Sequence, residues 1–285
     1  MNKSSKNKTF LITGLVFIVA SLCFVLYPTV SNAVNNYFSA ATINNYTTSL
    51  DNISAADRAD YFSAADKYNK NLREMVNGFS YSTDSLIDGY DDILNFGDGL
   101  IGYIEIKTID VKLPIYHGDT DKVLEKGVAH IPNTAFPTGG VGNHSVLSAH
   151  TGFPTQVFFD NLNEVEIGDI IKVSVLDETL TYKVTAKNIV EPTDISLLSV
   201  DDSKDLLSLI TCYPYGVNSH RLIVTAEYAD KSDENNITVQ DTDKILDSSG
   251  SPNLIFIIFT VISMTIISVI VIVAVYKKGR KKNAQ

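Results

Sequence analysis

The sequence predicts a mainly β domain, a barrel or sandwich of short strands, lying between two apolar segments near the ends of the chain. Short runs rich in β-branched and aromatic residues recur between residues 100 and 228, several of them alternate apolar with polar side chains, and turn residues separate them. A region of roughly 130 residues can bury a core of its own. Strands are expected at residues 101–106, 109–115, 144–150, 169–175, 180–186, 206–212 and 221–228, with short helices at 120–126 and 155–163.

The N-terminal segment has the pattern of a membrane anchor. Lys3, Lys6 and Lys8 precede an apolar run from Phe10 to about Leu26. Small residues at 31–33 would allow cleavage as a signal peptide, but the run is long for a signal core, so we favour an uncleaved anchor. We assign residues 1–34 to a basic cytoplasmic tail and this anchor.

The C-terminal segment predicts a second membrane helix. Residues 254–275 carry no charge and precede five basic residues, and such a stretch is long enough to span a bilayer. We assign residues 254–285 to this helix and its cytoplasmic tail, and residues 230–253, which are polar and acidic, to a flexible tether. Basic residues at both extreme ends place both termini in the cytoplasm and the part between them outside the cell.

The charge distribution agrees with two compartments. Eight of the 23 basic residues lie in the two tails, whereas all 33 acidic residues lie between them, so the middle of the chain has a formal charge of about −18. A domain this acidic is a poor candidate for binding nucleic acid. The sequence also has no phosphate-binding glycine loop and no zinc-ligand spacing, and we expect neither a cofactor nor a metal.

Residues 35–98 are expected to form a helical extension and a connector. Ser54 to Asp57 has the form of a capping box, with Asp in place of the usual Glu, and starts a helix expected to reach Met75. Its apolar stripe would pack on the β domain. Residues 77–98 contain several glycines and predict an irregular connector with one short helical turn.

Cys212 is the leading candidate for chemistry. Cys23 lies in the N-terminal apolar run, so no disulfide can form within the β domain, and a lone thiol there is either reactive or buried and inert. A free thiol has a pKa of about 8.5 and needs a neighbouring cation or base to be a good nucleophile. Arg221 begins the strand after the Cys212 loop and can favour the thiolate or donate to a developing oxyanion.

A base must come from one of five histidines. We favour His150, because it ends a short apolar strand just as Cys212 does, and a Gly-Phe-Pro turn follows it. His220 is the second choice; it would point away from Arg221 if that segment is extended. His117 and His130 have the setting of strand-edge or loop residues, and His144 could cap a turn.

Two segments resemble the sortase family. T-C-Y-P-Y-G-V-N-S-H-R-L-I-V, at residues 211–224, closely resembles the cysteine signature of sortases and specifically of the class C, pilus-assembling branch. G-V-A-H-I-P-N-T-A-F-P-T-G-G from Gly127, with H-S-V-L-S-A-H-T-G-F-P after it, is similar to the family's histidine segment. The likeness covers about residues 99–229, and it implies a closed sortase-type β-barrel in which His150, Cys212 and Arg221 match the catalytic triad.

The resemblance has two departures. Class C members usually have H-R-G-L-P after the histidine, where this chain has Thr151 and Phe153. Many also carry a lid with an Asp-Pro-aromatic motif, and no such motif occurs between Asn69 and Asn95. A lid of the usual kind is therefore expected to be absent or replaced by another segment.

The resemblance implies a cysteine transpeptidase anchored in the plasma membrane of a Gram-positive bacterium. It would cleave an LPxTG-like sorting signal through a Cys thioester and join the product to an amine, a pilin lysine in the class C case. The alternatives are a housekeeping sortase that uses a peptidoglycan amine, a hydrolase, and an inactive assembly scaffold. The expected partners are pilin or surface-protein substrates with a C-terminal sorting signal.

Overall fold

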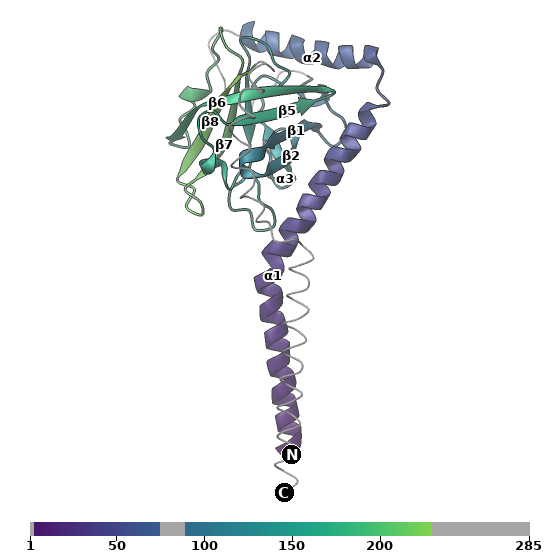
Figure 1. The fold of residues 1–285 in the computed structure, drawn as a ribbon, viewed down its shortest axis with the longest axis vertical. Helices are drawn as coiled ribbons and strands as arrows, with labels where there is room; N and C mark the ends of the chain where they lie inside the picture. The colour runs from purple at the N-terminus through teal and green to yellow at the C-terminus, as the bar shows by residue number, and fades with distance from the viewer. Residues whose placement is uncertain (1–2, 75–88, 230–285) are drawn as a thin grey trace. The chain divides into compact units, whose positions relative to one another are not determined.

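A computed structural model describes residues 3–74 and 89–229, in which eight strands form a closed barrel (Figure 1). The strands follow one another around the barrel in the order β1-β2-β3-β4-β7-β8-β6-β5. The mainly β prediction and the closed barrel are therefore confirmed. The strands are β1 (Leu100–Ile106), β2 (Val111–His117), β3 (Val128–His130), β4 (His144–Ser148), β5 (Ile170–Val175), β6 (Glu178–Val190), β7 (Leu206–Tyr213) and β8 (His220–Tyr228).

Two neighbouring pairs, β2 with β3 and β4 with β7, are parallel, and the other six pairs are antiparallel. A parallel pair requires a crossover connection. Between β2 and β3 that connection contains the short helix α3 (Asp121–Leu124), which confirms the helix expected at 120–126. Between β4 and β7 the crossover is the whole β5–β6 hairpin, so the ends of β4 and β7 meet although 62 residues separate Ala149 from its neighbour Thr211.

The barrel interior is closely packed. Ile104, Leu147, Leu209 and Val224 are fully buried in one continuous apolar cluster. Gly102 in β1 is required by a close approach, because a Cβ there would lie 2.1 Å from the carbonyl oxygen of Ser174 in β5. The interior is thus filled by side chains and leaves the outer surface of the barrel for chemistry.

Helix α1 (Lys3–Leu50) is the long apolar helix expected at the N-terminus, and it continues well beyond the apolar run. Its Thr13–Leu50 stretch is long and apolar enough to cross a membrane, with a mean hydropathy of 2.1 in its most apolar window. The described residues from Asn35 to Ala229 belong to one compact unit, so the last turns of α1 belong with the barrel. In these turns, the hydroxyl of Tyr46 donates a hydrogen bond to the Ile101 carbonyl and accepts one from the Leu176 amide.

Helix α2 (Ala55–Glu74) begins where the capping box predicts. The Asp57 amide donates to the Ser54 hydroxyl, which in turn donates to the Asp57 carboxylate. The apolar stripe packs on the β domain as expected: Tyr68 is buried with its ring 4.9 Å from that of Phe136. Beside it, the fully buried Asn69 amide accepts from the backbone nitrogen of Phe136 and donates to its carbonyl.

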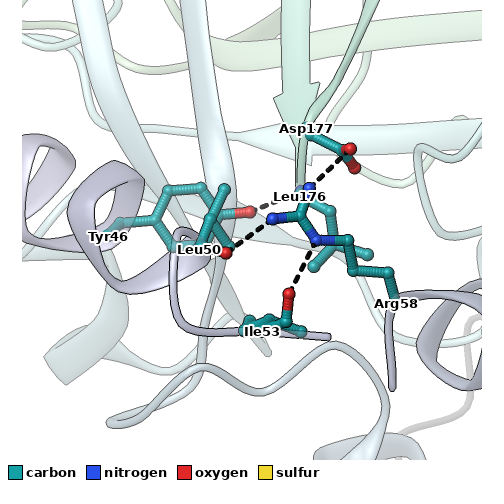
Figure 2. A network of polar contacts seen from close by, with 6 residues as sticks. All are labelled: Tyr46, Leu50, Ile53, Arg58, Leu176 and Asp177. Carbon is teal, nitrogen blue, oxygen red and sulfur yellow. Dashed lines mark hydrogen bonds and ion pairs between the residues drawn. The ribbon is translucent and has the colours of Figure 1, made fainter. Parts of the chain in front are cut away.

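Arg58 ties α1, α2 and the barrel together (Figure 2). Its guanidinium donates to the carbonyls of Leu50, at the end of α1, and of Ile53. It also pairs with Asp177, in the turn between β5 and β6, at 2.6 Å. One planar fork therefore joins the last carbonyl of α1, a carbonyl of the α1–α2 connection and a carboxylate of the barrel.

Several expectations differ from the structure or lie outside it. The helix expected at 155–163 is wrong: this stretch is a series of turns followed by the 3-10 helix η3 (Leu162–Glu164). The Phe158 amide bonds to the Asp160 side chain and the Phe159 amide to the His150 carbonyl, so neither joins a helical ladder. Strand β3 was not expected, because three residues cannot display an alternating pattern. The turn expected in the connector is the 3-10 helix η1 (Tyr90–Asp92).

Other predictions fall on residues that the structure does not describe. The tether at 230–253 and the C-terminal helix and tail at 254–285 lie outside the described residues. The Asn69–Asn95 region, where no lid motif was found, is described only at 69–74 and 89–95. The prediction about the lid therefore stays a prediction.

Candidate active site

Cys212 and Arg221 face each other across the β7–β8 pair. These antiparallel strands are in register from Leu206 with Glu227 to Tyr213 with His220, and Cys212 is the direct partner of Arg221. Directly opposed residues in an antiparallel pair have Cβ atoms about 4.5–5.5 Å apart. The strand–loop–strand prediction is therefore confirmed, and it brings a thiol and a guanidinium together at one end of the barrel.

His150 reaches the same place from β4. The parallel β4–β7 pairing matches Ser148 with Ile210, and the Ala149 amide donates to the Ile210 carbonyl at 3.2 Å. The Thr211 hydroxyl donates to the Ala149 carbonyl at 2.8 Å, which extends the pairing by a further residue. His150 and Cys212 are the next residues on the two strands, so they lie side by side.

All three candidate residues are on the outer face of the barrel. Side chains alternate along a strand, and Leu207 and Leu209 of β7 and Leu222 and Val224 of β8 belong to the barrel core. The residues that alternate with these core positions along β7 and β8, which include Cys212 and Arg221, therefore point outward. Both residues, like His150, are half-buried, so the site is partly accessible to solvent.

An outer apolar cluster supports this face. Ile131, Val146, Leu198 and Ile223 are buried together there, apart from the barrel core, with Ile210 packed against them. Leu198 comes from the β6–β7 connection, which contains the 3-10 helix η4 (Ser196–Leu198). This connection therefore covers the outer face next to the candidate residues.

The other four histidines are engaged elsewhere. The His144 ring lies between the Ser199 carbonyl and the Ser208 hydroxyl, and burial lowers its pKa. Burial lowers the pKa of His130 to about 3, and its ring contacts the Tyr90 hydroxyl and the Ala135 carbonyl. The ring nitrogens of His117 contact two backbone carbonyls.

His220, the second choice as base, starts β8 and alternates with Arg221, so it points to the other face as predicted. Its ring nitrogen lies 3.4 Å from the Glu191 carboxylate. Of the five histidines in the chain, all of which are described, His150 is the one beside Cys212.

Aromatic side chains surround His150. The Phe153 ring stacks on the imidazole with centroids 5.2 Å apart and planes 2° from parallel. The fully buried Phe158 lies edge-on to both rings. Phe153 stands where class C members usually have leucine, and this structure places it against the candidate base.

The loops after His150 and after Cys212 touch each other. Gly152 has φ of +74°, and a Cβ there would lie 3.4 Å from the ring of Tyr215. Tyr215 is otherwise 66% exposed. The Arg221 guanidinium donates to the carbonyl of Asn218, in the same loop as Tyr215, and to that of His220 at the start of β8. The sequence did not predict the contact between Tyr215 and Gly152, because no pattern of residues indicates which loops meet.

A buried carboxyl group with a raised pKa lies away from these residues. Asp205 is buried at the start of β7, the opposite end from Cys212, and desolvation raises its carboxyl pKa to about 6. Such a shift often marks an active site, but Asp205 accepts from the Gly140 amide and the Tyr182 hydroxyl, as a structural residue does. Among the described residues, no three His, Cys, Asp or Glu side chains gather as metal ligands.

The arrangement suits acyl transfer. A thiol, an imidazole and a guanidinium on adjacent strands supply a nucleophile, an acid–base group and a cation for an oxyanion. Comparison with known proteins agrees. The sortase domain family matches residues 104–229.

Among curated proteins, the chain is 30% identical to sortase A of Staphylococcus aureus over 154 residues, which cover 53% of this chain and 70% of that protein. It is 32% identical to sortase D of Bacillus subtilis over 114 residues, 40% of this chain and about half, 54%, of that protein.

Two solved structures are similar over nearly their whole length. Sortase C1 from Streptococcus agalactiae has a TM-score of 0.63 and 34% identity, covering 67% of this chain and 98% of that one. A Clostridium perfringens sortase C solved with the C-terminal cell wall sorting motif has a TM-score of 0.60 and 38% identity, covering 67% and 99%. With its closed barrel and these relatives, the chain belongs to the sortase family of cysteine transpeptidases, and its structural neighbours include class C sortases.

Proposed function

We propose that this protein is a membrane-anchored sortase that cleaves an LPxTG-like sorting signal and joins the product to a pilin lysine, so that it polymerises pili. The observation that carries the proposal is the meeting of His150, Cys212 and Arg221 on the outer face of the barrel. The likeness to class C structures favours pilin as the substrate class. The apolar stretch Thr13–Leu50 supports anchoring.

In the first half-reaction, the Cys212 thiolate attacks the carbonyl carbon of the scissile peptide bond. Arg221 donates to the oxygen that becomes negatively charged, which stabilises the tetrahedral intermediate. The carbon–nitrogen bond breaks, and His150 gives its proton to the leaving amine. A thioester between the substrate and Cys212 remains.

In the second half-reaction, a lysine amine attacks the thioester carbonyl and loses a proton to His150. The carbon–sulfur bond breaks, Cys212 leaves as a thiolate, and an isopeptide bond forms. An enzyme held at the membrane meets substrates that are tethered beside it, with the catalytic domain outside the cell and both termini in the cytoplasm.

The test uses the full chain in detergent micelles with a pilin that bears an LPxTG-like tail. Mass spectrometry should find an acyl adduct on Cys212, and gels should show lysine-linked oligomers, both of which Cys212→Ala abolishes. An adduct that yields only cleaved monomer would favour hydrolysis or a housekeeping role. Absence of any adduct on the folded protein would favour an inactive scaffold.

A housekeeping sortase is the second candidate, because a curated relative 30% identical to this chain is a sortase A. Adding a peptidoglycan-derived amine in competition with the pilin separates the two. Preferred capture of that amine would support cell-wall anchoring over polymerisation.

A further inference from the structure

The chain segment from His150 to Asp160 forms a loop that is closed on itself by one carboxylate. The Asp160 carboxylate accepts from two backbone amides with different oxygens: Oδ1 from Gly152 at 2.9 Å and Oδ2 from Phe158 at 2.9 Å. The Phe159 amide donates to the His150 carbonyl at 3.0 Å. Two ends of the loop are thereby held together directly after the candidate base.

The loop is also held from outside. In the unit that contains the barrel, Asn35 of α1 donates to the Thr155 carbonyl at 2.9 Å. The amide of Gln156, which is only 5% exposed, donates to the Ser39 hydroxyl of the same helix at 3.0 Å. The middle of the loop therefore rests on α1, while its base depends on Asp160.

The parts of the loop that Asp160 holds are those that touch the site. Gly152, whose amide it accepts, lies between His150 and Phe153 and supports the Tyr215 ring. Phe153 stacks on the His150 imidazole, and Phe158 packs edge-on against both. Loss of the carboxylate would free the backbone on both sides of Phe153 and hence the ring that fixes the imidazole.

We propose that Asp160 is a positioning residue for the acyl transfer, which acts by holding the Gly152 and Phe158 amides so that Phe153 keeps the His150 imidazole beside Cys212. Asp160 does not touch the reacting atoms. The proposal rests on the role proposed above for His150. It adds a residue to the machinery within a stretch that the sequence pattern had marked as a helix without chemistry.

The matched control is Asp169, in the same connection between β4 and β5. Its carboxylate also accepts a hydrogen bond from a nearby backbone amide, that of Glu166 at 2.9 Å. This bond closes the turn before β5 and holds neither of the amides that Asp160 binds. Asp160→Asn keeps one acceptor oxygen, so its kcat should lie between those of the wild type and Asp160→Ala. Asp160→Ala keeps none.

The experiment measures acyl transfer and the His150 ring together, in the full chain. Asp160→Ala should lower kcat about 10–100-fold, since misplacing a catalytic group by about 1 Å can cost a factor of that order, and KM for an LPxTG-like peptide should change less than about threefold. Asp160→Asn should lie between it and wild type, and Asp169→Asn should match wild type.

The second readout is the NMR signal of the His150 ring protons, assigned with His150→Gln among the five histidines. Stacking under Phe153 shifts these signals upfield, and Asp160→Ala and Phe153→Leu should both remove that shift, whereas Asp169→Asn should keep it. An unchanged His150 signal in a folded Asp160→Ala protein would overturn the proposal, whatever the change in kcat. A wild-type protein that never acylates would instead contradict the proposed function, while the ring signals would still decide on the positioning.

Discussion

Replacing Asp205 with asparagine should stabilise the protein at neutral pH. The carboxyl is 7% exposed, and desolvation raises its pKa from 3.8 to about 6. An amide can keep both contacts, because its oxygen can accept from the Gly140 amide and its NH2 group can donate to the Tyr182 hydroxyl. The substitution therefore removes a buried charge at pH 7 and keeps one hydrogen bond to each neighbour, with the Tyr182 hydroxyl accepting where it donates in the wild type.

The magnitude follows from the pKa. Each pKa unit corresponds to about 1.4 kcal/mol, so ionising Asp205 at pH 7 costs the folded state about 3 kcal/mol relative to the unfolded chain. Because the pKa of Asp205 is higher in the folded state, the protonated carboxyl contributes its full stability below about pH 4, and this contribution is lost as the pH rises through about 6. We expect Asp205→Asn to match wild type near pH 4 and to be more stable by about 2–3 kcal/mol at pH 7.

The assay is denaturant unfolding of the full chain in detergent at several pH values, followed by tyrosine fluorescence because the chain has 14 tyrosines and no tryptophan. Protonation of His130, whose pKa is lowered in the folded state, also destabilises the protein in acid. The difference in unfolding free energy between the two proteins cancels this effect, because both contain His130. A stability difference that does not change between pH 4 and pH 7 would refute the reasoning. Transpeptidation should be unaffected, since Asp205 is at the opposite end of β7 from Cys212.

Three further predictions address the site and its supports. Arg221→Lys should lower the rate of thioester formation about 100-fold, because an ammonium cannot present the planar fork to an oxyanion. It should slow alkylation of Cys212 less than tenfold. Equal losses in the two rates would mean that Arg221 acts on the thiol alone. Asn69→Leu should destabilise the protein by about 2 kcal/mol in denaturant unfolding, because it leaves the buried Phe136 amide without a partner, while the Phe136 carbonyl keeps the Thr138 amide. A cost below about 1 kcal/mol would contradict this. Arg58→Met should cost about 1–2 kcal/mol, because the Ile53 carbonyl loses its guanidinium donor and the Leu50 carbonyl keeps only the Ile53 amide. Asp177→Asn should cost less than about 1 kcal/mol, because that carboxylate is 53% exposed. The reverse order would show that the ion pair dominates.

Local pattern was enough to predict most of the elements. Alternation of apolar and polar residues gave seven of the eight strands to within a few residues, and the Ser54–Asp57 cap marked the start of α2. It failed where the signal is short or misleading. Strand β3 is three residues long. The 155–163 stretch has a composition compatible with a helix, but its Phe158 amide bonds to Asp160 and its Phe159 amide to the His150 carbonyl instead.

The candidate residues themselves also followed from the sequence, because a strand end followed by a turn is a local feature. Cys212 and His150 occupy such positions, Arg221 begins the strand after the Cys212 loop, and the antiparallel pairing of Cys212 with Arg221 needs only a hairpin. What only the tertiary structure decided is the parallel pairing of β4 with β7, which brings His150 to Cys212 across the whole β5–β6 hairpin. That pairing depends on closing the barrel, a non-local property that no window of the sequence contains.

The same reason explains the contacts around the site. The contact of Tyr215 with Gly152 joins two loops whose paths are set by the strands they leave. The stacking of Phe153 on His150 and the two bonds of Asp160 form within one loop, and that loop reaches the site only because β4 ends beside β7. The sequence by itself determined the chemistry available at each strand end. The closed barrel decided which of those ends meet, because it is the burial of the barrel core that fixes the strand order and register.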